Sequence, residues 1–329
     1  MRLIDFARVG SGHPVVPLMG FPGIQLTQST IRQNLFNDEL QARTIEALVA
    51  RFRPDAAFVM MDLSVEAEAI GLPVSYPLNE SPTVSEHPVR SQSDLAQFHV
   101  LDPRFCARVH TFEAVTRRLA ASLDVPLGAY VVGPFSFAGL MMGATEIAMA
   151  TVDDPDLVHA AATYATEVIT PYALALAEAG AQMICILEPT ATFISPRAFK
   201  RFSGVYVQQI VAALAASEAD PMTILHVCGK TKHLVPAMCD TGVQGLSLDA
   251  PMDMVGTIRK MPGDVVLVGN IDPVAVMVRS TPQQVRATTQ ALGRAMAPYP
   301  NFVMSTGCDL PPETPLANIE AFMMAAREV

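Results

Sequence analysis

Three residues whose side chains can bind zinc stand at the ends of two apolar segments. His226 and Cys228 end the run Thr-Ile-Leu-His-Val-Cys-Gly, and Cys308 follows the run Phe-Val-Met-Ser-Thr-Gly. Alternate side chains of a strand face the same way, so a strand here places His226 and Cys228 on one face. An imidazole nitrogen and two thiolates are soft ligands that suit zinc. Three protein ligands with a fourth position left open are typical of a catalytic zinc site.

The same residues can also be interpreted as ordinary members of a core. Cysteine is among the most buried residue types, and a histidine beside it can be satisfied by hydrogen bonds in the core. A structural zinc site is disfavoured because the chain has no Cys-x-x-Cys motif. The His-x-Cys spacing, followed by Gly-Cys-Asp after a later apolar run, favours metal binding over burial alone.

Short apolar runs alternate with stretches of helical periodicity along the 329 residues. Most runs are continuously apolar, which is typical of strands buried on both faces of a parallel sheet. Eight such strands alternating with helices predict a single (β/α)8 barrel (TIM barrel), with residues 1–329 in one domain. The predicted strands are 15–19, 56–61, 127–132, 183–187, 223–227, 243–248, 265–268 and 302–304, and 79–98 is predicted to be an irregular excursion. Helices are predicted to begin at Thr281-Pro282 and at Thr314-Pro315.

Polar residues follow six of the predicted strands. Because the C-terminal ends of barrel strands face the active site, these residues are predicted to share one mouth. Taken one at a time, Asp and Asn are ordinary turn residues, so the prediction depends on their convergence. The residues are Asp62, Glu188, His226 with Cys228, Asp249, Asn270 and Cys308.

Composition excludes several classes of partner. The chain is 50% hydrophobic, and its formal net charge of −10 with no offsetting Lys/Arg cluster argues against a nucleic-acid surface. Residues 125–145 carry no charge and are long enough to span a bilayer, but their glycines and Gly133-Pro134 predict a strand, a loop and a buried helix start instead of a membrane span. Five widely spaced cysteines, and charges in the first eight residues, predict free thiols in a reducing, cytoplasmic setting.

Several motifs resemble those of the uroporphyrinogen decarboxylase superfamily, and within it the branch of methylcobamide:coenzyme M methyltransferases. The resemblance runs nearly from end to end, and the His-x-Cys and the last two motifs are its most specific parts. The motifs are Met61-Asp-Leu-Ser-Val-Glu66-Ala-Glu68-Ala-Ile-Gly71, Gly133-Pro134-Phe135, Glu188-Pro189-Thr190 with Ser195-Pro196, His226-Val-Cys228-Gly229, Gly269-Asn270-Ile-Asp272-Pro273 and Gly307-Cys308-Asp309-Leu310-Pro311.

The resemblance implies a barrel enzyme whose zinc binds a thiol acceptor and activates it for methylation by a methylated corrinoid protein. His226, Cys228 and Cys308 are then the expected zinc ligands. The chain has no Asp-x-His-x-x-Gly corrinoid-binding signature, so the methylcobamide is expected on a partner protein. The methyl acceptor is expected to be a small molecule such as coenzyme M.

Four further residues are expected to act at the same site. Asp249, 21 residues after Cys228, is a candidate for the fourth zinc position until the acceptor displaces it. Glu188 is a candidate for holding the acceptor or a zinc ligand, so both carboxylates are expected to be catalytic. Asp62 and Asn270 are expected to bind substrate, with Asn270 donating hydrogen bonds.

Three alternatives remain open at this point. The acceptor of a corrinoid-dependent methyltransferase can be tetrahydrofolate or another molecule instead of a thiol. A uroporphyrinogen decarboxylase is disfavoured, because that enzyme is known for an arginine-rich N-terminal motif that holds substrate carboxylates, and residues 17–25 here contain no arginine. A non-catalytic barrel that binds a corrinoid protein does not need the Cys and His residues.

Overall fold

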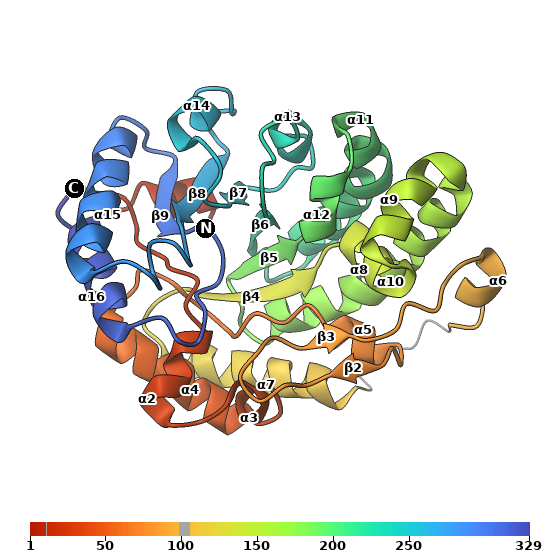
Figure 1. Ribbon diagram of the computed structural model, residues 1–329, viewed down its shortest axis with the longest axis horizontal. Coiled ribbons are helices and arrows are strands. Elements are labelled where there is room, and N and C mark those ends of the chain that lie inside the picture. Colours follow the sequence, from red (N-terminus) through yellow and green to blue (C-terminus); the bar gives the residue numbers. More distant parts are fainter. Residues whose placement is uncertain (11, 99–105) are drawn as a thin grey trace.

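The structure is a computed structural model that describes residues 1–10, 12–98 and 106–329. Its centre is a sheet of seven parallel strands in the order β1-β4-β5-β6-β7-β8-β9, and every strand residue is buried. Figure 1 shows this sheet curling, with the long helices on its outer side. The strands are β1 (Ala57–Phe58), β4 (Leu127–Val132), β5 (Met183–Leu187), β6 (Met222–Val227), β7 (Gly245–Leu248), β8 (Val266–Ile271) and β9 (Phe302–Thr306).

The prediction of a first strand at 15–19 is wrong. This segment lies against β9, where Val15 forms an isolated parallel bridge with Met304, and the Val15 carbonyl accepts the Asp55 N–H just before β1 (3.0 Å). It therefore occupies the gap between the two edges of the sheet without becoming a strand. Pro17 has no N–H to donate toward β1, and the Leu18 N–H is bonded to the Thr306 hydroxyl (3.1 Å) instead of a backbone carbonyl. The chain thus has a curled seven-stranded sheet where eight strands were predicted.

The register of the sheet aligns the strand ends that carry the polar residues. Leu187 pairs with His226, and His226 pairs with Ser247, so β5, β6 and β7 end at similar heights. Ile271 pairs with Thr306 at the ends of β8 and β9. β8 runs to Ile271, so Asn270 lies inside this strand. The sequence-based prediction that Asn270 follows the strand is therefore wrong. The C-terminal ends of these strands consequently meet at one mouth.

Six long helices cover the sheet. They are α4 (Asp38–Phe52), α7 (Ala107–Ser122), α10 (Pro155–Glu178), α12 (Val205–Ala216), α15 (Pro282–Met296) and α16 (Leu316–Ala326). The predicted start at Thr281 is confirmed, since Thr281 and Gln284 form a capping box around Pro282. The last helix begins one residue later than predicted, at Leu316, and buries Ile319, Phe322 and Met323.

Shorter elements connect these layers. They are α1 (Leu3–Ala7), η1 (Phe21–Gly23), α2 (Ile24–Thr27), α3 (Ile31–Leu35), α5 (Val65–Ala69), α6 (Gln92–Leu95), α8 (Pro134–Met142), α9 (Ala144–Asp153), η3 (Pro189–Phe193), α11 (Pro196–Phe199), η4 (Lys200–Gly204), α13 (Val235–Cys239) and α14 (Met254–Ile258). The strands β2 (Val74–Ser75) and β3 (Thr83–Val84) form an antiparallel pair, so the predicted excursion at 79–98 is partly regular.

The apolar stretch 125–145 forms β4 and the largely buried helix α8, as predicted. Within the described residues no single helix has the length and apolar character needed to cross a membrane. The helices α8 and α9 pass that test of length and composition only together, and they are bent by 103° relative to each other.

Candidate metal and methyl-transfer site

The three predicted zinc ligands come together at the mouth. The side-chain donor atoms of His226, Cys228 and Cys308 all lie within 4.8 Å of one another. His226 Nε2 is 3.1 Å from Cys228 Sγ, and the two sulfurs of Cys228 and Cys308 are 3.9 Å apart. His226 is buried in β6, whereas both cysteines are half-buried just beyond the ends of β6 and β9. Among the described residues this is the cluster of His, Cys, Asp and Glu suited to holding a metal ion.

A hydrogen-bond partner fixes the orientation of the His226 ring. Its Nδ1 lies 2.9 Å from the hydroxyl of Ser247, which is its neighbour on β7. This contact leaves Nε2 facing the cysteine sulfurs. Metal-binding histidines usually have their second ring nitrogen held in this way, which fixes both tautomer and direction. Ser247 was not singled out from the sequence, because its role depends on the pairing of β6 with β7.

The two cysteine sulfurs interact as a pair. A hydrogen bond from the Cys308 thiol lowers the pKa of Cys228, against the opposing effects of burial and of the Asp249 charge. The pKa of Cys308 is raised, first by this hydrogen bond and then by burial. Because a thiolate is the form that binds metal, each thiol would lose its proton on binding a metal ion.

Asp249 and Asn270 lie beside the cluster, and their polar side-chain atoms bond to backbone. The Asp249 carboxylate accepts the N–H groups of Gly229 (2.8 Å) and Ala250 (2.7 Å). The Asn270 amide donates to carbonyls of the segment 249–252, including that of Met252 (2.9 Å). Neither side chain belongs to the set of converging ligand atoms.

Glu188 follows β5 and is fully buried. Its carboxylate accepts the N–H groups of Phe135 (2.9 Å) and Ser136 (2.8 Å) in the first turn of α8, and the hydroxyl of Ser203 (3.0 Å). Burial raises its pKa, and these hydrogen bonds lower it only in part. The carboxylate therefore joins β5 to the start of α8 and to η4, and its contacts do not include the cysteine–histidine cluster.

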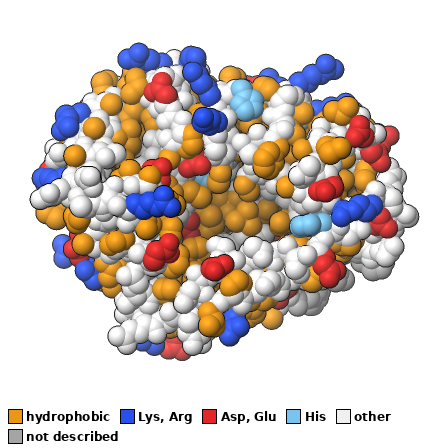
Figure 2. Space-filling view, in the orientation of Figure 1, with side chains coloured by type: hydrophobic (Ala, Val, Ile, Leu, Met, Phe, Trp, Pro, Cys, Tyr) orange, Lys and Arg blue, Asp and Glu red, His pale blue; other side chains and the backbone are white. Residues whose placement is uncertain are grey.

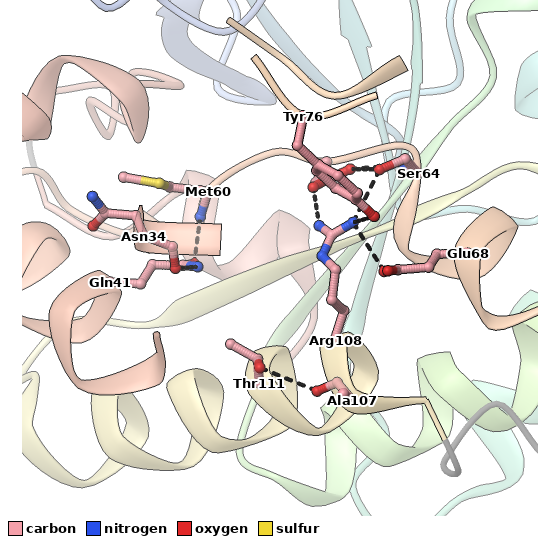
Figure 3. Close-up of polar contacts among 10 residues, drawn as sticks. Asn34, Gln41, Met60, Ser64, Glu68, Tyr76, Ala107, Arg108 and Thr111 are labelled. Atoms are coloured by element: carbon pink, nitrogen blue, oxygen red, sulfur yellow. Dashed lines mark hydrogen bonds and ion pairs between the residues drawn. The ribbon is translucent and has the colours of Figure 1, made fainter. Parts of the chain in front are cut away.

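Asp62 takes part in a different polar network around Arg108. Figure 3 labels Arg108, Ser64, Glu68 and Tyr76 of this network. Asp62 forms an ion pair with Arg108 of α7, and its other oxygen accepts the N–H and hydroxyl of Ser64 (2.8 and 2.6 Å). Arg108 also donates to Ser64 and to the hydroxyl of Tyr76 (both 3.1 Å) and lies 3.5 Å from Glu68. The side chains of Asp62 and Arg108 are 0% and 1% exposed, so neither is free to contact a substrate in this conformation.

Arg108 was overlooked in the sequence. A signal was available, because Arg108 lies on the same helix face as Phe112 and Val115, which are buried. An arginine on an apolar helix face requires a buried acidic partner. Its ring neighbours Phe36, Tyr76 and Phe112 lie 5.1–5.7 Å from the guanidinium, which adds cation–π contacts.

The face seen in Figure 2 is hollowed near its centre. Hydrophobic side chains line most of this hollow, and charged side chains surround it (Figure 2). The other three cysteines do not belong to the cluster of His226, Cys228 and Cys308: Cys185 is buried in β5, Cys239 is the last residue of α13, and Cys106 precedes α7.

A model of one protein family matches nearly the whole chain. The model of the family "Uroporphyrinogen decarboxylase (URO-D)" matches residues 14–329. The chain belongs to this family. The family resemblance expected from the sequence motifs is thus confirmed.

Two kinds of relative are found within the family. The methylcobamide:CoM methyltransferase MtbA of Methanosarcina mazei is 29% identical over 283 residues, which cover 83% of this chain and 79% of that protein. The methylcobamide:CoM methyltransferase MtaA of Methanosarcina barkeri is 28% identical over 300 residues, covering 89% and 85%. A uroporphyrinogen decarboxylase of Neisseria meningitidis is 31% identical over 271 residues, covering 80% and 74%.

A solved structure of a methyltransferase from Methanosarcina mazei has the same fold. Its TM-score is 0.89 at 24% sequence identity, and the match covers 99% of this chain and 97% of the other. At this level of identity the match establishes the shared fold, and the site residues must carry the argument about function.

Proposed function

We propose that this protein is a zinc-dependent methyltransferase that moves a methyl group from a methylcobamide on a partner protein to a thiol acceptor. The single observation that carries the proposal is the convergence of one imidazole and two thiols within 4.8 Å at the mouth of the sheet. The two methyltransferase relatives, matched over most of their length, support the same class of reaction.

The donor set fits zinc. Two sulfurs and one ring nitrogen are the ligand types that zinc prefers, and three of them leave one position of a tetrahedron free. The hydrogen bond between His226 and Ser247 already directs Nε2 toward the sulfurs. The proposed ligands are therefore His226, Cys228 and Cys308.

The chemistry of the proposed reaction requires an activated sulfur. A free thiol has a pKa of about 8.5, so only a small fraction is the nucleophilic thiolate at neutral pH. Zinc held by these three residues would lower the pKa of a coordinated thiol, so that its sulfur could attack the methyl carbon. The new carbon–sulfur bond would form as the methyl–cobalt bond breaks, and cobalt(I) would remain on the partner's corrinoid. The two cysteinates contribute negative charge that keeps this sulfur electron-rich, while the ring of His226 is held in place by Ser247.

The remaining predicted residues act as supports in this proposal. Asp249 and Asn270 bond to the backbone next to the ligands, and Glu188 and Asp62 bond to α8 and to Arg108. Since Arg108 is buried and paired with Asp62, the described residues do not place it as the positive partner that a sulfonate-bearing acceptor such as coenzyme M prefers. We therefore propose the thiol group as the recognised feature and leave the rest of the acceptor to experiment.

The methyl donor is proposed to be a separate corrinoid protein, because the sequence has no corrinoid-binding signature of its own. The family also contains decarboxylases, one of them 31% identical to this chain. That reaction needs no set of thiols, so the donor atoms separate the two classes. One domain spanning 1–329 and a cytoplasmic location are part of the same proposal.

The test is to incubate the zinc-loaded protein with methylcobalamin and a panel of acceptors while following the cobalamin spectrum. We expect demethylation with small thiols, including coenzyme M, and about one tightly bound zinc per chain. Calorimetry in two buffers of different ionisation enthalpy should show about one proton released when the thiol binds. Demethylation with tetrahydrofolate alone would exclude the thiol mechanism. Turnover of a porphyrinogen without demethylation would exclude the methyltransferase class.

A further inference from the structure

The two loops that carry the cysteine ligands come from distant parts of the sequence, yet both touch the segment 249–252, here called the bridging loop. Cys228 lies beyond β6 and Cys308 beyond β9, with two strands of the sheet between them. No hydrogen bond joins Gly229 to Gly307 directly among the described residues. The separation of the two sulfurs therefore depends on what lies between these loops.

Asp249 joins the bridging loop to the first cysteine loop. Its Oδ2 accepts the N–H of Gly229, the residue after Cys228, at 2.8 Å. Gly229 has a φ of +82°, a left-handed conformation that favours glycine, and this conformation accompanies the N–H contact with Asp249. The second oxygen, Oδ1, accepts the Ala250 N–H at 2.7 Å, so the carboxylate is held at both ends.

The second cysteine loop packs against the same carboxylate. A Cβ atom placed on Gly307, the residue before Cys308, would lie 2.6 Å from the Ala250 nitrogen and 3.1 Å from Asp249 Oδ1. Such distances are closer than ordinary contacts, so a glycine is needed for the loops to approach this closely. Asp249 thus bonds to the neighbour of one cysteine and touches the neighbour of the other.

The bridging loop is itself fixed by Asn270 of β8. The Asn270 amide donates to the carbonyls of Asp249 (3.0 Å) and Met252 (2.9 Å), with a longer contact to Ala250 (3.4 Å). Asn270 is buried, so water does not compete strongly for these bonds. The loop is consequently held from the sheet and not only from its own ends.

We infer that Asp249, held by Asn270, is a positioning residue that sets the separation of Cys228 and Cys308, and that it is not a metal ligand. Each of its oxygens accepts a backbone N–H group, and the converging donor atoms come from the other three residues. The fourth position of the metal is then left to the acceptor. This inference rests on the metal site of the proposed function.

The test compares metal binding by three variants, using Zn²⁺ competition with a chromophoric chelator and the absorption of the Co²⁺-substituted protein. Asp249→Asn keeps one acceptor oxygen and loses the other, and Gly307→Ala pushes the loops apart. We expect both to weaken Zn²⁺ binding by on the order of 10- to 100-fold. Both should also reduce the thiolate-to-cobalt absorption per bound Co²⁺, because one sulfur no longer reaches the ion.

The matched control is Asp253→Asn, which removes the same charge four residues away. Asp253 caps α14 through the Gly256 N–H (3.0 Å) and touches neither cysteine loop, so its Zn²⁺ affinity should change less than about 2-fold. Unfolding curves of all three variants separate loss of the site from loss of the fold.

Three outcomes decide the inference. Unchanged thiolate-to-cobalt absorption in Asp249→Asn, with altered visible d–d bands only, would identify Asp249 as a direct ligand and overturn it. Wild-type Zn²⁺ affinity in both Asp249→Asn and Gly307→Ala would overturn it while leaving the proposed function intact. Failure of the unsubstituted protein to bind Zn²⁺ or Co²⁺ would overturn the metal site of the proposed function, and the inference with it.

Discussion

Two polar regions lie beyond the C-terminal ends of the strands, and they differ in whether their ionisable groups have oppositely charged partners within the chain. Around Arg108, beyond β1, each charged group has an oppositely charged or hydrogen-bonding partner within reach, as Figure 3 shows. Around Cys228, beyond β6, two thiols and an imidazole place their donor atoms within 4.8 Å of one another. The first region pairs its buried charges within the chain, whereas the second gathers donor atoms that the proposed zinc ion would bind. The difference separates a structural network from a binding site, although both contain residues that look functional in the sequence.

The largest expected effect is the loss of the metal site when one thiol is removed. Cys308→Ala should lose tight zinc binding and methyl transfer together, because two donors do not hold the ion in a closed geometry. Metal analysis after dialysis and the cobalamin assay measure both. Cys239→Ala is the control, since Cys239 is also half-buried but lies on α13 outside the cluster. Retention of one zinc per chain in Cys308→Ala would contradict the ligand set.

Replacing Arg108 should lower the stability of the fold without changing metal binding. Arg108→Met leaves Asp62 buried without its counter-charge, so the free energy of unfolding should fall by about 3–5 kcal/mol. Urea unfolding measures this loss. The control is Arg118→Met on the same helix, whose ion pair with Asp38 is exposed and should be worth less than about 1 kcal/mol. Weakened zinc binding in a stably folded Arg108→Met would show that the two regions are coupled.

Glu66, next to the Arg108 network, should make stability depend on pH. Burial raises its pKa to about 7, although the Val132 N–H bond opposes this. A raised pKa in the folded state favours the protonated carboxyl, so its contribution is complete below about pH 4.5 and is lost as the pH rises through 7. Relative to wild type, Glu66→Gln should therefore gain up to about 3 kcal/mol in unfolding free energy between pH 5 and pH 8.

Urea unfolding at several pH values measures this difference, with Glu313→Gln at an exposed position as the control. A difference between Glu66→Gln and wild type that does not change with pH would mean that Glu66 is ionised throughout. In that case the Arg108 region would carry one more negative charge than the burial of Glu66 suggests.

The smallest expected effect concerns the support of the imidazole. Ser247→Ala removes the partner of His226 Nδ1, and zinc affinity should fall by about 10-fold with little change in stability. Competition with a chromophoric chelator measures the affinity. An unchanged affinity would mean that packing in β6 alone orients the ring.

The sequence predicted that His226, Cys228 and Cys308 lie close together, because strand periodicity and the common end of the strands are enough to place them. His226 and Cys228 share a face of one strand end, and Cys308 follows a strand that ends at the same mouth. The expectations for Asp62 and Glu188 were less informative. Their position after a strand was predicted correctly, but their partners, Arg108 on α7 and Ser136 on α8, come from helices that pattern alone does not orient.

The error at 15–19 has a similar physical origin. The run Val-Val-Pro-Leu-Met is apolar enough for a buried strand, and it lies where the first strand of a barrel belongs. Apolar character reports burial, however, whereas a strand also requires N–H donors on both sides. Pro17 lacks the N–H that a strand would donate toward β1, so the segment does not pair as a strand on that side. This effect depends on which side of the segment faces a neighbouring strand, and the sequence alone does not show that.

Because β9 and β1 are the two edges of the sheet, the proposed metal site also bears on the stability of the fold. His226 and Cys228 belong to β6, which is paired with strands on both sides, while Cys308 follows β9, an edge of the sheet. A zinc ion held by all three residues would therefore link the edge strand β9 to the inner strand β6. Because the free energy of metal binding adds to that of folding, zinc bound at the proposed site would stabilise the position of β9, which has a paired strand on one side only.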